Sequence, residues 1–348
     1  MTTARCEQCQ LPFTPNSARN RFCSRECQVD SYRGRSTSES KKRKETGFMW
    51  DPVRVARPVK VTVPKAKPIK RDRLTALVLP DPQFGYRWLD DGTLEPFHDD
   101  AALSIALQIA EVERPDLTIW LGDFLDLAPL GRYRKEEGLA RTVQAAIDRG
   151  YEELAAHRAL CGEMRLIEGN HDARLHLAVI DNLVAASGLR RAARPHEFPA
   201  LSVPSLLRLE DLDTKYVGAY PAGATYINDN LACIHGRKLD IGQVLNDERT
   251  SLIQGHIHRI DIRYSTRNTR EEPKFTVAMS PGTLARIDGS VPSMRGGVDL
   301  YGKSVRSWEN WQQGVLVVRY EPGDGLFDLE MVPIFNGRAY HMGREYRA

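Results

Sequence analysis

The sequence predicts an α/β fold in which two mixed sheets pack face to face with helices outside, preceded by a small separate domain. Three observations lead to this expectation. Between about residues 74 and 187, short apolar runs alternate with helical spacing, as in crossover units that build a largely parallel sheet. From about residue 224 to 320 the apolar runs are strand-like and separated by turns, which predicts a second sheet. Four of the six cysteines crowd into residues 6–27, ahead of the first apolar run.

The first half of the main body supplies strands and helices in alternation. Asp99 or Asp100 is expected to cap a helix over 101–113, after an aromatic loop over 84–98. Helical spacing then resumes as far as about Cys161, and two further helices are expected over about 173–187 and 202–210. The strands of this half are expected at Leu74–Leu79, Leu117–Leu121 and Met164–Ile167.

The second half reads as a series of strands without an internal repeat. Turns such as Asn228–Asn230 and Glu321–Gly325 separate some of them. The expected strands are Ala224–Asn228, Leu231–His235, Leu252–Gly255, Ile260–Thr266, Lys274–Met279 and Val315–Tyr320.

Composition and length indicate a soluble globular protein. The chain has 348 residues, of which 41% are hydrophobic and 27% are charged. The first residues lack the apolar run of a signal peptide, and no apolar stretch approaches the ~18 residues that a membrane span needs. We therefore expect a cytoplasmic location, or the cytoplasm of a host if the protein is viral, and no membrane partner.

The cysteine pairs near the N-terminus have the spacing of a structural zinc site. Thiolates two and three residues apart can chelate one ion, and two such pairs complete a tetrahedron. A unit this small, with only Leu11, Phe13 and Phe22 as its core, would need such a metal to fold. Its sequence is similar to treble-clef or ribbon zinc fingers, which places a finger over residues 1–33, and chance thiols are the alternative. The expected ligands are Cys6, Cys9, Cys23 and Cys27.

The N-terminal fifth of the chain is strongly basic. Residues 1–73 hold 18 Lys and Arg against 7 Asp and Glu, a net charge of +11, which leaves −8 for the remainder of a chain with a net charge of +3. Prolines spaced by Val and Lys over residues 34–73 suit an extended tether, although 59–63 could instead form an edge strand. Such an arm is expected to meet an anionic partner, with a merely solubilising tail as the alternative.

Five polar clusters follow apolar runs at predicted strand ends, where open α/β sheets bind ligands. They are Asp81–Gln83, Gly122–Asp126, Gly169–Asp172, Ile234–Gly236 and Gly255–His258. Oxygen and nitrogen donors gathered at one sheet edge bind divalent cations, and one carboxylate can bridge two of them. Two ions roughly 3.5–4 Å apart form the clamp used for in-line attack on phosphorus, and each lowers the pKa of bound water.

The order D-x-Q, G-D-x-x-D, G-N-H-D, an isolated His and G-H-x-H resembles the calcineurin-like metallophosphoesterase superfamily, from residue 74 to about 285. The resemblance implies a four-layer α-β-β-α sandwich over residues 74–348. It implies one metal held by Asp81, Gln83, Asp123 and His258, and a second held by Asp123, Asn170, His235 and His256. It further implies that His171 protonates the leaving oxygen and that Asp126 pairs with that imidazole and raises its pKa. The segment 280–286 resembles the turn that closes the site in relatives.

Some positions in this pattern leave alternatives open. Gln83 stands where relatives more often have His, which favours Mn²⁺, or else Mg²⁺, over Zn²⁺ or Fe, unless the amide binds only through water. Asp172 is expected to be structural, capping the next helix. Arg174 either reaches a phosphate oxygen or caps a helix end.

Three functions are compatible with these motifs. A DNA or RNA nuclease is favoured by the finger, the basic arm and a cationic segment in which Arg132 and Arg134 would bind substrate. The first alternative is a phosphodiesterase or phosphatase for nucleotides or other small molecules, whose finger binds a protein. The second is a non-catalytic adaptor, against which the retained histidines argue. A homodimer is a further expectation, since relatives often pair, and the tail 306–314 resembles phage-borne members.

Overall fold

The computed structural model describes residues 3–15, 21–24, 27, 73–131, 135–192, 197–247, 250–268, 273–294, 309–323 and 325–348. The chain divides into two compact units, Met1–Val55 and Ala56–Ala348. Most of the basic tether, and both Arg132 and Arg134, lie outside the described residues. In the first unit, β1 (Ala4–Arg5) and β2 (Pro12–Phe13) form a short antiparallel pair.

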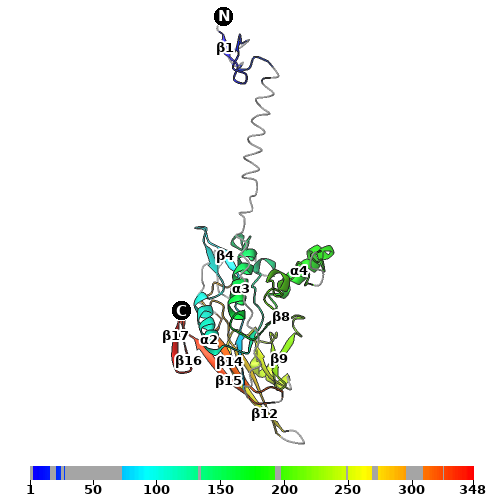
Figure 1. The fold of residues 1–348 in the computed structure, drawn as a ribbon, viewed down its shortest axis with the longest axis vertical. Coiled ribbons are helices and arrows are strands. Elements are labelled where there is room, and N and C mark those ends of the chain that lie inside the picture. The colour runs from blue at the N-terminus through cyan, green and yellow to red at the C-terminus, as the bar shows by residue number, and fades with distance from the viewer. Residues whose placement is uncertain are drawn as a thin grey trace. The chain divides into compact units, whose positions relative to one another are not determined.

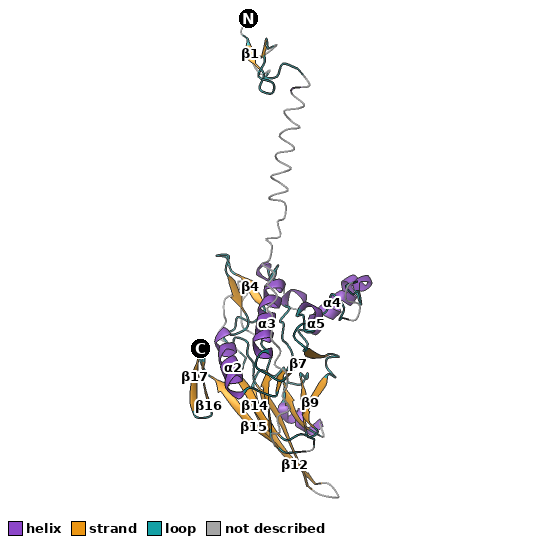
Figure 2. Ribbon diagram, viewed as in Figure 1, coloured by secondary structure: helices purple, strands orange, loops and turns teal. Residues whose placement is uncertain are grey.

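The larger sheet of the second unit has eight strands in the order β17-β16-β15-β14-β3-β6-β7-β8 (Figure 2). The middle strand β3 pairs in parallel with β6, which continues through β7 to β8, and pairs antiparallel with β14. The parallel strands are β3 (Leu74–Leu79), β6 (Leu117–Trp120), β7 (Glu163–Ile167) and β8 (Thr214–Val217). The antiparallel strands are β14 (Gln313–Tyr320), β15 (Phe327–Ile334), β16 (Arg338–His341) and β17 (Arg344–Arg347).

The smaller sheet has five strands in the order β12-β13-β11-β10-β9. Its centre is parallel, because β11 pairs in parallel with both β10 and β13. The two edge strands run antiparallel to their neighbours. The strands are β9 (Ala224–Asn228), β10 (Leu231–Ile234), β11 (Ser251–Gln254), β12 (Ile260–Asn268) and β13 (Pro273–Pro281).

The two sheets pack face to face and helices cover their outer faces, which confirms the predicted layers. Alternate residues of β3 point to opposite faces: Val78 joins a core between the sheets with Ile253 of β11, whereas Leu77 faces helices. On that outer face lie α2 (Asp100–Glu113) and α3 (Val143–Arg158) (Figure 1). The helix α6 (Ile241–Asp247), absent from the sequence expectation, covers the outer face of the smaller sheet.

Local signals set several element ends. The side chain of Asp99 caps α2 by accepting from the N–H of Ala102, which decides between the two predicted caps. The helix expected over 202–210 is wrong in length: α5 covers only Val203–Leu206, because Arg208 adopts a left-handed backbone with φ of 52°. The helix expected over 173–187 divides into α4 (Ala173–Leu183) and the 3-10 turn η3 (Val184–Ala186).

The segment 84–98 is an ordered hairpin rather than the expected loop. Its strands are β4 (Tyr86–Trp88) and β5 (Leu94–Pro96), which pair antiparallel. Two 3-10 turns follow α2, η1 (Ala128–Leu130) and η2 (Glu137–Leu139). Within the described residues, no helix combines the length and the apolar character that crossing a membrane requires.

Candidate functional site

The predicted clusters meet because the parallel strands of both sheets have their carboxyl ends in the same region of the molecule. Asp81 follows β3, Asp123 follows β6 and Asn170 follows β7, all in the larger sheet. His235 follows β10, and His256 and His258 follow β11, in the smaller sheet. The carboxyl ends of parallel strands share an edge, so residues scattered over nearly 180 positions come together.

Two groups of donors within this region fit a divalent ion each. In one, the donor atoms of Asp123, His235 and His256 all lie within 4.8 Å of one another, and in the other those of Asp81, Asp123 and His258 do. Asp123 belongs to both groups, as a bridging carboxylate would. Both carboxylates are almost completely buried, and buried carboxylates are stable only when paired or coordinated to a cation.

The imidazole of His235 is oriented for a cation by its backbone contact. Its Nδ1 donates to the carbonyl oxygen of Leu121 at 2.8 Å, which turns Nε2 toward the donor groups. Nε2 lies 3.0 Å from Oδ1 of Asn170 and 3.3 Å from Oδ1 of Asp123. Burial lowers the pKa of His235, but Asp123 and Asp81 outweigh it and raise the pKa to about 9.

Gln83 and His258 carry unsatisfied polar atoms that point to a missing ligand. Both amide atoms of the buried Gln83 side chain lack a hydrogen-bond partner among the described residues, as does Nε2 of His258. Nε2 of His258 lies 3.4 Å from Oδ1 of Asp81. A buried amide without partners costs about 1–3 kcal/mol, and a cation would satisfy Oε1 of Gln83 and Nε2 of His258 together, whereas the amide NH2 would still need an acceptor. The donor set thus fits the ion predicted for this group.

The backbone is left-handed at five of the seven predicted ligands, which is unusual for residues other than glycine. The φ values are 38° at Asp81, 49° at Gln83, 45° at Asp123, 66° at His256 and 56° at His258. Hydrogen bonds hold these conformations: Gln83 N–H donates to the Asp123 carbonyl, and His256 N–H donates to the Asp81 carboxylate. The predicted closing turn contributes as well, because Oγ1 of Thr283 donates to the carbonyl of Asp81.

His171 and Asp126 form a buried pair beside the donor groups. Nδ1 of His171 lies 2.7 Å from Oδ1 of Asp126, and Nε2 lies 3.8 Å from Oδ2 of Asp123. The pair thus presents Nε2 toward the donor groups. Burial raises the pKa of Asp123, but the neighbouring His171 and His235 hold it well below its usual value. Arg174 contacts the same pair, because its Nη1 donates to the backbone oxygen of Asp126 at 2.6 Å.

Asp172 binds a neighbouring turn rather than the helix that it precedes. It occupies the N-cap position of α4, but its side chain makes no cap bond. Its carboxylate instead accepts the N–H groups of Phe124, Leu125 and Gly169. Burial and the nearby Asp123 raise its pKa to about 7 against these donors. The capping prediction is wrong because these donors, two of them on the turn after β6, take up both carboxylate oxygens.

Three residues that shape the site were not found from the sequence. Glu168 accepts from the hydroxyl of Tyr216 and from the N–H of Tyr220, which ties the loop after β8 to the G-N-H-D turn. The Tyr220 ring lies 5.8 Å from that of His235, and the Trp311 ring lies 4.1 Å from that of His258. For two of them the only sequence signal was their position in the chain: Glu168 directly precedes G-N-H-D, and Trp311 belongs to the tail 306–314.

The four N-terminal cysteines converge as the zinc prediction requires. Their Sγ atoms lie within 4.8 Å of one another, and no disulfide joins them. The Sγ atom of Cys23 lies 3.5 Å from those of both Cys9 and Cys27. Burial raises the pKa of Cys6, but the backbone N–H groups of Cys9 and Cys23 lower it to about 6. This donor set fits one tetrahedral zinc ion.

The remaining two cysteines, Cys161 and Cys233, are buried and unpaired by disulfides, as expected of reduced core residues. Burial raises the pKa of both thiols, so they stay protonated and unreactive at neutral pH.

Comparison with known proteins finds a likeness in structure but none in sequence. No protein-family model matches the chain, and no curated protein matches it in sequence. Among solved structures, the chain is similar to the phosphoesterase YfcE from E. coli, with 11% sequence identity and a TM-score of 0.31. The likeness covers 74% of this chain and 98% of that chain.

Proposed function

We propose that this protein is a metal-dependent phosphoesterase that hydrolyses phosphodiester bonds, with DNA or RNA as its substrate. The observation that carries the proposal is the position of Asp123, which belongs to both donor groups and lies beside the His171–Asp126 pair. Two adjacent cation positions with an imidazole next to them match the needs of in-line displacement at phosphorus.

The residues that would hold the ions are Asp81, Gln83, Asp123 and His258 on one side, and Asp123, Asn170, His235 and His256 on the other. When bound, the two ions would neutralise charge on the phosphoryl oxygens and lower the pKa of water. Oxygen-rich donors with a glutamine favour Mn²⁺ or Mg²⁺ over Zn²⁺.

The chain itself supplies the proton and the orientation. Asp126 accepts from Nδ1 of His171, which fixes the ring and leaves Nε2 directed toward the donor groups. A proton delivered from this Nε2 to the leaving oxygen is general-acid catalysis, which typically contributes 10²–10⁴-fold. Arg174 holds the backbone of Asp126 in place and so acts as a positioning residue.

The preference for nucleic acid rests on the N-terminal region. The net charge of +11 over residues 1–73 would neutralise backbone phosphates without reading sequence. The cysteine cluster would supply a folded zinc unit at the start of this arm. An arm of this kind would raise the local concentration of polymer at the hydrolytic site.

The alternative is a phosphodiesterase or phosphatase for free nucleotides, in which the zinc unit binds a protein. One observation favours this alternative. Gly236, the residue after His235, lines an open cavity of about 320 Å³, a volume suited to one small organic group.

Hydrolysis of a substrate panel by the full chain tests the proposal. Metal-stripped protein should be inactive toward bis-p-nitrophenyl phosphate and regain activity with Mn²⁺, and Asp123→Ala should abolish that activity. The matched control is Asp181→Ala, an exposed carboxylate on α4. Linear and circular DNA, RNA and cyclic and linear nucleotides then identify the substrate. Activity of the Asp123→Ala protein would refute the site, and a preference for free nucleotides over polymers would favour the alternative.

A further inference from the structure

The cavity near His235 has one apolar side and one cationic side. The loop between β8 and β9 contributes Pro221 and Ala222, and Ile234 of β10 and Val244 of α6 contribute further apolar surface. The segment after β10, with Gly236, Arg237 and Lys238, and Gln254 of β11 complete the lining. The cavity volume of about 320 Å³ falls within the range of pockets that bind small organic groups.

Short contacts connect this cavity to the donor groups. Gly236, which lines it, directly follows the predicted ligand His235. Tyr220, which precedes the cavity residue Pro221, lies with its ring 5.8 Å from that of His235. The N–H of Tyr220 donates to Glu168 at 2.9 Å, and Glu168 directly precedes the G-N-H-D turn. The wall of the cavity is thus fixed relative to the donor groups.

Arg237 gives the cavity a positive charge that remains available. Its side chain is exposed, and no hydrogen bond or ion pair to it occurs among the described residues, whereas the adjacent Lys238 is paired with Asp247.

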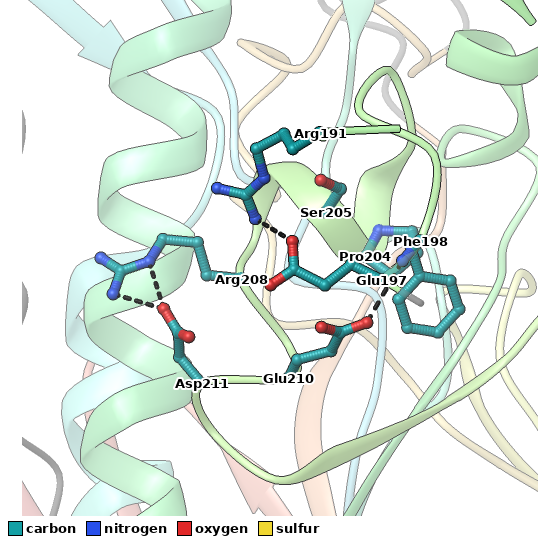
Figure 3. A pocket seen from close by; sticks show the side chains of 8 residues that line it. All are labelled: Arg191, Glu197, Phe198, Pro204, Ser205, Arg208, Glu210 and Asp211. Atoms are coloured by element: carbon teal, nitrogen blue, oxygen red, sulfur yellow. Dashed lines mark hydrogen bonds and ion pairs between the residues drawn. The ribbon is translucent and has the colours of Figure 1, made fainter. Parts of the chain in front are cut away.

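A second cavity, of about 200 Å³, differs in this respect (Figure 3). Both of its arginines face carboxylates of the same cavity: Arg191 is paired with Glu197, and Arg208 donates to Asp211 at 2.6 and 2.8 Å (Figure 3). Because these charges are satisfied internally, this second cavity lacks an available cation for a phosphate among its described residues.

We propose that the cavity beside His235 binds the nucleoside of a phosphoester whose phosphorus lies at the donor groups, with Arg237 contacting a phosphate oxygen. The inference rests on the proposed function and narrows its substrate to the nucleotide ester at the end of a DNA or RNA strand. The flat heterocycle packs against Pro221, Ile234 and Val244, where it loses contact with water, and this preference for planar apolar groups does not depend on base sequence.

Two p-nitrophenyl diesters that differ only in the group retained test the inference with the full, Mn²⁺-loaded chain. Thymidine 5′-p-nitrophenyl phosphate carries a nucleoside, whereas methyl p-nitrophenyl phosphate carries a methyl group. We expect the wild-type kcat/KM to be at least 10-fold higher for the thymidine ester. Ala222→Trp, which fills the cavity, should reduce this ratio to near one, and Arg237→Gln should raise the KM of the thymidine ester. Arg263→Gln, an exposed arginine on β12, is the matched control and should leave the ratio unchanged.

Failure of the inference is distinct from failure of the proposed function. Equal kcat/KM values for the two esters in the wild type, or an unchanged ratio in both cavity variants, would overturn the subsite while leaving the phosphoesterase intact. Hydrolysis of neither ester would overturn the function. In that case, calorimetric titration of the Mn²⁺-loaded chain with thymidine 5′-monophosphate decides the subsite alone, because Arg237→Gln should weaken binding and Arg263→Gln should not. This titration also decides if Ala222→Trp fails to fold.

Discussion

Gly169 lies so close to Asp123 that a Cβ atom added to the glycine would be 2.1 Å from the backbone nitrogen of Asp123 and 2.2 Å from its Oδ1. The turns that follow β6 and β7 are therefore in direct backbone contact. This contact lets the N–H of His171 donate to Oδ1 of Asp123 at 2.7 Å. Only glycine permits this approach, so Gly169, the first residue of G-N-H-D, determines the positions of Asn170 and His171.

Gly169→Ala should therefore damage both the fold and the site. The added methyl group must displace backbone rather than a flexible side chain, and overpacking of this kind costs about 1–3 kcal/mol. We expect a lower thermal midpoint in EDTA and weaker Mn²⁺ binding by calorimetry. Gly242→Ala in α6, where the new Cβ would meet only a side-chain oxygen at 3.1 Å, is the control. Equal midpoints for the two variants would contradict the close-contact argument.

Removing the proton donor should separate turnover from metal binding. His171→Ala is expected to lower kcat 10²–10⁴-fold while the chain still binds two Mn²⁺ ions, because His171 is outside both donor groups. Asp126→Asn should give a smaller loss, since the ring remains but its orientation is less fixed. The measurements are steady-state kinetics and metal content by mass spectrometry, with the exposed His176→Ala as a control. An unchanged rate in His171→Ala would exclude the proposed acid.

Substitutions in one donor group should remove its metal ion without removing the other. His258→Ala removes a donor from the group with Asp81, and His256→Ala removes one from the group with His235. Each variant should bind one tight Mn²⁺ ion instead of two, whereas Asp123→Ala should lose both because this carboxylate is common to the groups. Equilibrium dialysis gives the stoichiometry directly. Retention of two tight ions by Asp123→Ala would show that the carboxylate does not bridge.

Deleting residues 1–73 should weaken polymer cleavage without affecting small esters. The deleted residues carry the net charge of +11, so the effect should be largest at low salt and shrink as salt rises. The measurement compares cleavage of linear DNA or RNA with hydrolysis of bis-p-nitrophenyl phosphate over a salt series. Equal polymer cleavage by both chains at physiological salt would mean that the arm is not a substrate recruiter.

Stability should fall in mild acid because of His98. The buried ring packs between Phe84 and Tyr86, and burial lowers its pKa to about 4 from an ordinary value of 6.5. Above pH 6.5 the ring is neutral in both states. Between pH 6.5 and 4 the unfolded chain takes up a proton that the folded chain excludes, so the free energy of unfolding decreases by up to about 3 kcal/mol.

The test of this pH dependence is a denaturant series in EDTA from pH 7 to pH 4.5. His98→Phe keeps the packing but removes the titration, so its unfolding free energy should decrease less over this range than that of the wild type. Other groups titrate in both proteins, and the difference therefore isolates His98. His176→Phe, at an exposed position of α4, should behave as the wild type does. Parallel curves for wild type and His98→Phe would refute the argument.

The sequence was sufficient for the layers and for the convergence of donors, because both follow from short-range rules. Apolar runs mark buried strands, and the residues that follow parallel strands lie at one edge of the sheet. The sequence alone therefore predicts that Asp81, Asn170 and His256 lie close together. The strands β15, β16 and β17 were missed because few of their residues are fully buried and several are charged, for example Arg338 and Glu330. The short helix α6 gave too few turns for a periodic signal.

What escaped prediction depends on contacts between distant parts of the chain. Asp172 has the local sequence setting of a helix cap, yet two of its partners, Phe124 and Leu125, are nearly 50 residues away and follow another strand. The contact between Trp311 and His258 likewise joins the tail to the G-H-x-H turn. No spacing rule within one segment can reveal such pairs, because strand order in the sheet decides which segments become neighbours.

The left-handed backbone at the predicted ligands bears on how affinity and stability are linked in this protein. Each such residue costs of order 1 kcal/mol or more, and folding meets that cost before any ion arrives. The turns that carry the donor groups are therefore formed by folding, so cation binding costs little free energy for rearranging the chain. The folding free energy of the two sheets offsets the backbone strain at the ligands, and metal affinity depends on that offset. Mutations far from the site that lower this folding free energy should let the strained ligand turns relax first. Metal binding would then be lost well below the temperature at which the sheets unfold.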